Sequence, residues 1–124
     1  MALRCFIVDD STPFLDAARA LLEADGFSVV GVATTIEQAL RQVPDTEPDV
    51  VLVDVDLGGE SGFDLARRFR LETSLHPSRV ILISTHAEED IAELIESVPV
   101  AAYLPKSQLS ASAIRRILDA TVEG

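Results

Sequence analysis

The sequence predicts an α/β domain built on a parallel sheet, and three observations support this class. Short apolar runs rich in β-branched residues recur five times along the chain. Several of them are continuously apolar rather than alternating, which is typical of strands covered on both faces. Segments with helical caps and helical spacing separate the runs, and this alternation favours helices on both faces of one sheet. The five predicted strands are Leu3–Val8, Val29–Ala33, Val50–Val53, Val80–Ile83 and Val100–Leu104.

The helix predicted after the first strand is marked at both ends. Thr12 followed by Pro13 is typical of a cap with proline at the first helical position, and Gly26 is typical of the residue just past a helix end. Apolar residues at helical spacing define the face that we expect to be buried, and these are Phe14, Leu15, Ala18, Leu21 and Leu22.

The remaining helices are indicated by their caps or by their apolar spacing. The second and the fourth each begin with the spacing of a capping box, Thr35 with Gln38 and Thr85 with Glu88. Ser61 is expected to cap the third helix, which runs to about residue 73. The fifth helix has one apolar stripe, made by Ile114, Ile117 and Leu118.

The length and the charge of the chain limit what it can do. Its 124 residues fit one domain, residues 1–124. Ten Lys and Arg residues against 21 Asp and Glu give a formal charge of −11, which disfavours direct binding to nucleic acid or to an anionic membrane. No apolar segment approaches the roughly 20 residues that span a bilayer, and the N-terminus is not a signal peptide. The single cysteine, Cys5, predicts a buried thiol and a cytoplasmic location.

Polar residues of unusual type come at the ends of the predicted strands. In an open parallel sheet the carboxyl ends of the strands meet at one edge, where ligands bind. We therefore expect three carboxylates, one hydroxyl group and one amine to converge at that edge. They belong to Asp9, Asp10, Asp54, Ser84 and Lys106.

A cluster of three carboxylates requires a compensating cation. At about 5 Å and an effective dielectric constant near 20, each pair repels by roughly 3 kcal/mol, a large part of a total stability of about 5–15 kcal/mol. Mg²⁺ prefers carboxylate and carbonyl oxygens and removes this repulsion. A carboxylate nucleophile, a metal, a hydroxyl donor and a lysine together indicate phosphoryl transfer through an aspartyl phosphate.

The same residues resemble the receiver domain of bacterial two-component response regulators, in order and spacing, over essentially the whole chain. The resemblance rests on Asp9-Asp10, Val-Leu-Val-Asp54-Val-Asp56-Leu with Gly62, Leu-Ile-Ser84 and Tyr103-Leu-Pro-Lys106. It implies a doubly wound, flavodoxin-like receiver fold with five helices and five parallel strands in the order 2-1-3-4-5. It also implies that a sensor histidine kinase, or a phosphotransfer protein, donates a phosphoryl group to the chain in a magnesium-dependent phosphorelay.

The resemblance further implies which residues hold the phosphoryl group and the metal. Asp54 would be the phosphoacceptor, and Asp10 and Asp54 would bind Mg²⁺ directly. Asp9 would assist through a water molecule, and Asp56 would contribute its backbone carbonyl. Gly58 departs from the family pattern, because a proline commonly follows the phosphoacceptor by four residues.

Other implied roles concern the switch. Lys106 would pair with the phosphoryl group and Ser84 would hydrogen-bond to it. Tyr103 would move inward with Ser84 and change the surface formed by the fourth helix, the fifth strand and the fifth helix. A homodimer through that surface stays open, and so does the downstream output domain or protein. The resemblance also implies that Asp56 and His86 influence the lifetime of the phosphoryl group, because they occupy the two positions that do so in the family.

Two other functions remain as alternatives. A receiver-like interaction module that is never phosphorylated is one. The other is a small phosphatase of the haloacid-dehalogenase type, because Asp54-Val-Asp56 resembles the Asp-x-Asp motif of that family. We expect a stand-alone or excised receiver that promotes its own modification without being an enzyme in the turnover sense. The isomer of the Lys106–Ser107 peptide is left open, because proline is frequent at the second of these positions in the family.

Overall fold

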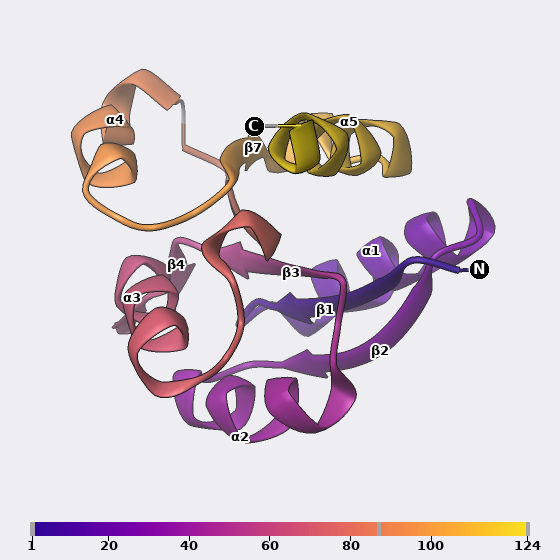
Figure 1. Ribbon diagram of the computed structural model, residues 1–124, viewed down its shortest axis with the longest axis horizontal. Helices are drawn as coiled ribbons and strands as arrows, with labels where there is room; N and C mark the ends of the chain where they lie inside the picture. The colour runs from indigo at the N-terminus through magenta and orange to yellow at the C-terminus, as the bar shows by residue number, and fades with distance from the viewer. Residues whose placement is uncertain (1, 87, 124) are drawn as a thin grey trace.

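A single five-stranded parallel sheet forms the centre of the protein (Figure 1). The computed structural model describes residues 2–86 and 88–123. The order across the sheet is β2-β1-β3-β6-β7, which confirms the predicted order 2-1-3-4-5. All neighbouring strands are parallel. The strands are β1 (Arg4–Val8), β2 (Ser28–Ala33), β3 (Val50–Asp54), β6 (Val80–Ser84) and β7 (Ala102–Pro105).

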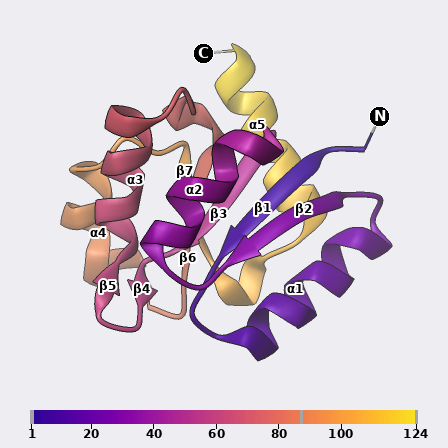
Figure 2. The same cartoon turned by 90° about the horizontal axis from the view of Figure 1, so that it is seen from below.

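Within the described residues, five α-helices cover the two faces of this sheet, as predicted. They are α1 (Thr12–Ala24), α2 (Ile36–Thr46), α3 (Gly62–Glu72), α4 (Glu88–Glu96) and α5 (Ala111–Glu123). Buried residues of α2 and α3 join one core, whereas those of α1 and α5 join the other. Figure 2 shows α2 and α3 side by side on their face. No helix in residues 2–86 and 88–123 is long and apolar enough to cross a membrane.

The two central strands explain the continuous apolar runs of the sequence. Every residue of β3 and of β6 is buried, because helices cover both faces of the sheet there. Cys5 is fully buried in β1, as predicted, and burial raises the pKa of its thiol to about 12. Leu21 is a correction to the predicted core, since 44% of it is exposed on α1.

The ends of α1 agree with the sequence except for the identity of the cap. The helix begins at Thr12, and the preceding Ser11 is the cap, with its hydroxyl accepting a hydrogen bond from the Phe14 amide at 3.4 Å. The predicted cap, Thr12, is therefore wrong by one residue. Gly26 has φ +91°, the left-handed conformation expected just past a helix end.

The predicted caps of α2 and α3 are present. Thr35 Oγ1 accepts from the Gln38 amide at 3.2 Å, but Gln38 Oε1 accepts from the Thr34 amide at 3.0 Å instead of closing a reciprocal box. Ser61 caps α3. The capping box predicted for α4 spans Ala87, which lies outside the described residues.

A short antiparallel hairpin between β3 and α3 was not predicted. Its strands are β4 (Asp56–Leu57) and β5 (Glu60–Ser61). Gly58 and Gly59 form the turn with φ +59° and +97°, as the tight two-residue hairpin turns require. Proline cannot adopt φ +59°, so the departure from the family pattern at position 58 goes with a turn that proline could not make.

Candidate functional site

The predicted site residues converge at the carboxyl edge of the sheet. Asp54 and Ser84 are the last residues of β3 and β6, and Lys106 directly follows β7. One carboxylate oxygen from each of Asp9, Asp10 and Asp54 lies within 4.8 Å of the other two. The structure therefore brings together the three carboxylates that the sequence placed at this edge.

Asp9 is the most deeply buried of these carboxylates, with no solvent exposure. Its Oδ1 accepts a hydrogen bond from the Ser11 amide at 2.8 Å, which ties the carboxylate to the start of α1. Its Oδ2 lies 2.7 Å from Nζ of Lys106. No donor among the described residues, Lys106 included, is aligned for a hydrogen bond to this oxygen, so the contact is an ion pair by distance.

Lys106 is the only lysine of the chain. Its Nζ also lies 3.0 Å from Oδ2 of Asp54, and 4.1 Å from the centre of the Phe14 ring. Burial lowers the pKa of this ammonium, but the contacts with Asp9 and Asp54 outweigh it and leave the pKa raised. Lys106 therefore stays charged over the whole neutral range.

Asp54 is also buried, at 6% exposure. Its Oδ1 accepts from the Asp56 amide at 3.1 Å, and its Oδ2 accepts from Lys106. Burial raises the pKa of Asp54 to about 6, although these two hydrogen bonds lower it part of the way; the charge of Asp9 raises it further. Around neutral pH the carboxylate is mostly ionised and poorly compensated.

The residues of this cluster fit a hard divalent cation. Three carboxylates share one ammonium group in the described part of the site, and Asp9 Oδ2 is a buried oxygen without an aligned donor. Asp10 is exposed, so its oxygens are open to a ligand. Such a set of oxygens is what Mg²⁺ prefers. The donor chemistry therefore agrees with the magnesium site that the sequence predicted.

Ser84 and Tyr103 both hydrogen-bond to the backbone of His86, a link that sequence reasoning missed. The buried Ser84 hydroxyl accepts from the His86 amide at 2.9 Å. The buried Tyr103 hydroxyl donates to the His86 carbonyl. Because both contacts involve the backbone of position 86, no side-chain pattern could have indicated them. A shift of Ser84 can reach Tyr103 through this one peptide segment.

Gly62 packs against the backbone of the phosphoacceptor position that the sequence predicted. A Cβ atom at Gly62 would lie 2.0 Å from the Asp54 carbonyl oxygen and 2.8 Å from the Val55 Cα atom. Its amide donates to the Val55 carbonyl at 3.0 Å. Only glycine allows the start of α3 to lie this close to the end of β3.

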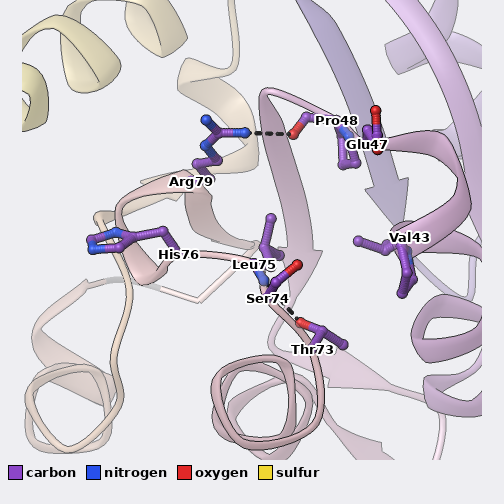
Figure 3. A pocket seen from close by; sticks show the side chains of 9 residues that line it. Val43, Glu47, Pro48, Thr73, Ser74, Leu75, His76 and Arg79 are labelled. Atoms are coloured by element: carbon purple, nitrogen blue, oxygen red, sulfur yellow. Dashed lines mark hydrogen bonds between the residues drawn. The ribbon is translucent and has the colours of Figure 1, made fainter.

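Two hollows differ in their chemistry. One, beside the acidic cluster, has a volume of about 650 Å³ and is lined by Asp56, Glu60 and His86 among others. The second, of about 440 Å³, lies at the opposite end of the sheet between the segments that precede β3 and β6 (Figure 3). There Arg79 donates to the Pro48 carbonyl at 3.4 Å. The predicted site residues lie at the end of the sheet that holds the first of these hollows.

Comparison with known proteins gives consistent matches. The model of the response regulator receiver domain matches residues 5–119. The chain is 36% identical over 85 residues to the sensory transduction protein LytT of Bacillus subtilis (strain 168). That match covers 68% of this chain and 34% of LytT, so the relative extends well beyond the matched part.

Solved structures match over nearly the whole chain. The signal receiver domain of a modulated diguanylate cyclase from Desulfovibrio desulfuricans gives a TM-score of 0.79 at 27% identity, over 99% of this chain and 95% of that one. A CheY-like response regulator receiver domain protein from Methanospirillum hungatei JF-1 gives a TM-score of 0.79 at 25% identity, over the full length of both.

Proposed function

The chain belongs to the response regulator receiver domains, and from that premise we propose that Asp54 is the residue that accepts the phosphoryl group. The observation that carries the proposal is the contact of this buried carboxylate with Lys106 at 3.0 Å, inside a cluster that includes Asp9 and Asp10. In this proposal residues 1–124 form one receiver domain, which acts as a phosphoacceptor switch in two-component signalling.

The proposed metal ligands are Asp10, Asp54 and the backbone carbonyl of Asp56, with Asp9 assisting through a water molecule. Bound Mg²⁺ would neutralise the carboxylates and the phosphoryl oxygens of the donor. The exposed Asp10 supports this assignment, because one of its carboxylate oxygens lies within 4.8 Å of one from Asp54. The Asp56 amide donates to Asp54, which puts the hairpin start next to the same carboxylate.

The proposed reaction is a displacement at phosphorus. A carboxylate oxygen of Asp54 attacks the phosphorus of a phosphohistidine on a sensor kinase or phosphotransfer protein. The bond from phosphorus to the imidazole nitrogen breaks, and that nitrogen keeps the electron pair and takes a proton. Lys106 would balance the charge of the transferred group, and the Ser84 hydroxyl would donate to one of its oxygens. With a pKa of about 6, Asp54 is still mainly the nucleophilic carboxylate at neutral pH.

The proposed output is a change around His86. When Ser84 turns toward the phosphoryl group, its contact with the His86 amide weakens, and Tyr103, bonded to the His86 carbonyl, responds. The surface of α4, β7 and α5 would then change and serve a homodimer, an output domain or another protein. Asp56 and His86 line one hollow beside the site, which supports a role for both in the lifetime of the phosphoryl group.

The proposed setting is the cytoplasm. The single cysteine, Cys5, supports this because it can form no disulfide with another cysteine of these residues, and disulfides are typical of oxidising compartments. The receiver is proposed to promote its own phosphorylation, and its own hydrolysis, without turning over a separate substrate.

The test is the intact mass of the protein after incubation with acetyl phosphate and Mg²⁺. The wild type should gain one phosphoryl group and Asp54→Asn should gain none. Full-rate labelling of Asp54→Asn would overturn the assignment of this residue. If the wild type gains no phosphoryl group and its NMR spectrum does not change when beryllofluoride and Mg²⁺ are added, the protein is an interaction module instead. Steady hydrolysis of phosphomonoesters would indicate a phosphatase.

A further inference from the structure

The turn of the β4–β5 hairpin lies against a proposed metal ligand. At Gly58 an added Cβ atom would lie 2.9 Å from Oδ2 of Asp10, whereas at Gly59 it would meet no atom of the described residues within 4 Å. The hairpin also begins with Asp56, whose amide donates to Asp54 and whose carbonyl is a proposed ligand. The hairpin therefore contacts Asp10 through its turn and Asp54 through its first residue.

A side chain of the same hairpin bonds to a distant helix. Oε1 of Glu60 accepts a hydrogen bond from the amide of Ile36, the first residue of α2, at 3.1 Å and across 24 positions of the sequence. The first amides of a helix have no partner inside the helix, and its positive end favours a carboxylate. The Thr35 hydroxyl accepts a hydrogen bond from the Gln38 amide, whereas the Glu60 carboxylate accepts from the Ile36 amide.

A turn made of two glycines needs such an external contact. Glycine has the largest conformational freedom of any residue, so the Gly58-Gly59 turn is not held by its own backbone. Leu57, on one side of the turn, is buried, and it pairs with Glu60 on the other side. The Glu60–Ile36 bond then fixes the opposite strand to α2. The hairpin is held between a core residue and a helix end, with its turn against Asp10.

We propose that Glu60 is a positioning residue for the magnesium site. It holds the β4–β5 hairpin on the start of α2, and thereby holds Gly58 against Asp10 and the Asp56 carbonyl beside Asp54. Glu60 itself binds no metal. The inference rests on the proposed function, because it concerns the same Mg²⁺ site.

The alternative is that Glu60 only caps α2. A cap stabilises the helix by the same hydrogen bond, but its loss would leave the metal affinity of the folded protein unchanged. The two roles therefore differ in Mg²⁺ affinity and not in stability. Glu37 offers a matched control, because it is an acidic residue in the first turn of the same helix and pairs with Arg68 of α3, at 3.7 Å.

The experiment is a titration of the full chain with MgCl₂ alone, followed by the amide NMR signals of Gly58 and Gly59. Glu60→Ala should weaken Mg²⁺ binding about fivefold, below the roughly 10–100-fold typical of groups bonded directly to a ligand. Glu60→Gln keeps the accepting oxygen and should stay within about twofold of the wild type. Glu37→Ala, which removes the same charge near the same helix end, should also stay within about twofold.

A second measurement needs no metal. Hydrogen exchange of the Ile36 amide should accelerate in Glu60→Ala and not in Glu37→Ala, which reports the lost contact directly. Unchanged Mg²⁺ affinity in Glu60→Ala together with faster exchange at Ile36 would overturn the proposal and leave only a helix cap. Equal weakening of Mg²⁺ binding in Glu37→Ala would also overturn the proposal, because the affinity would then follow the net charge of the protein. A wild type that does not bind Mg²⁺ would instead contradict the proposed metal site itself.

Discussion

Nζ of Lys106 lies 2.7 Å from Oδ2 of Asp9, a carboxylate with no solvent exposure. The same ammonium group lies 3.0 Å from Asp54, so one positive charge is shared by two buried negative charges. A buried charge that lacks a full counter-charge is costly. With two buried carboxylates and one ammonium group, the site carries an excess of negative charge until a second cation binds.

The raised pKa of Lys106 can be observed on a single signal. Because the chain has one lysine, labelled lysine gives one side-chain resonance. We expect it to stay protonated beyond about pH 10.4, where exposed lysines titrate, since Asp9 and Asp54 hold the charge against burial. Asp9→Asn should lower this pKa more than Asp54→Asn does, because Asp9 is the nearer and more buried partner.

The raised pKa of Lys106 also determines how its contribution to stability changes with pH. A cation whose pKa is raised by folding stabilises the protein below the unfolded pKa, and this stabilisation disappears as the pH rises through the folded value. The Lys106 contribution should therefore be lost only in strongly alkaline solution. A lysine signal that titrates at the usual pH in the wild type would contradict the ion pair.

Asp54 should destabilise the metal-free protein at neutral pH. Burial raises the pKa of Asp54 to about 6, so the folded state binds this proton more tightly than the unfolded chain. Stability then falls as the pH rises from about 4 to about 6, and the loss persists above that range. Asp54→Asn removes the charge, and Lys106 keeps Asp9 as its partner. We expect the variant to be more stable by up to about 3 kcal/mol at pH 8 and equal to the wild type near pH 4.

Urea denaturation at several pH values measures this difference. The matched control is Asp16→Asn, an exposed carboxylate of α1, which should change stability by less than about 0.5 kcal/mol at any pH. A wild type as stable as Asp54→Asn at pH 8 would contradict the prediction that the charged Asp54 destabilises the metal-free protein. Added Mg²⁺ should stabilise the wild type more than Asp54→Asn, because it binds the charged cluster.

Much of the fold and of the acidic cluster could be predicted because both follow from local patterns. Continuous apolar runs specified the strands, and the order of the strands brought Asp9, Asp10 and Asp54 to one edge. These residues needed no knowledge of tertiary contacts, since the end of each strand is visible in the sequence. Lys106 was placed by the same reasoning, directly after β7.

What could not be predicted depends on contacts between distant segments. The Glu60–Ile36 bond joins positions 24 apart, and the ring of Phe14 lies 4.1 Å from Lys106 although its helical spacing indicated only a core residue. The hairpin was missed because its strands have two residues each, too short for any alternation to appear. The contacts of His86 use backbone atoms, which carry no sequence signal.

Tyr103 should report the switch directly. It is the only tyrosine and the chain has no tryptophan, so the near-ultraviolet fluorescence comes from this residue. Beryllofluoride with Mg²⁺ should change that fluorescence, because Ser84 and Tyr103 both bond to His86. In Ser84→Ala we expect beryllofluoride still to bind, as read by fluorine NMR, with at least about half of the fluorescence change lost. The full change in that variant would show that Tyr103 does not depend on Ser84.

Gly62→Ala should damage the site through the backbone. The new Cβ atom would lie 2.0 Å from the Asp54 carbonyl oxygen, and a backbone atom cannot rotate away as a side chain can. We expect a loss of about 3 kcal/mol in the free energy of unfolding. The rate of phosphorylation by acetyl phosphate should also fall by about tenfold or more, because the end of β3 must shift and carries Asp54 with it.

Gly26→Ala separates the loss of stability from the loss of function. Gly26 has φ +91°, and no atom in residues 2–86 and 88–123 lies within 4 Å of an added Cβ, so alanine there is strained but displaces none of them. It should cost about 1–2 kcal/mol and leave the phosphorylation rate unchanged, because it follows α1 at the end of the molecule away from Asp54. If Gly26→Ala slowed phosphorylation as much as Gly62→Ala does, the rate would be following global stability. The close packing of Gly62 against Asp54 would then have no specific part in positioning the proposed phosphoacceptor.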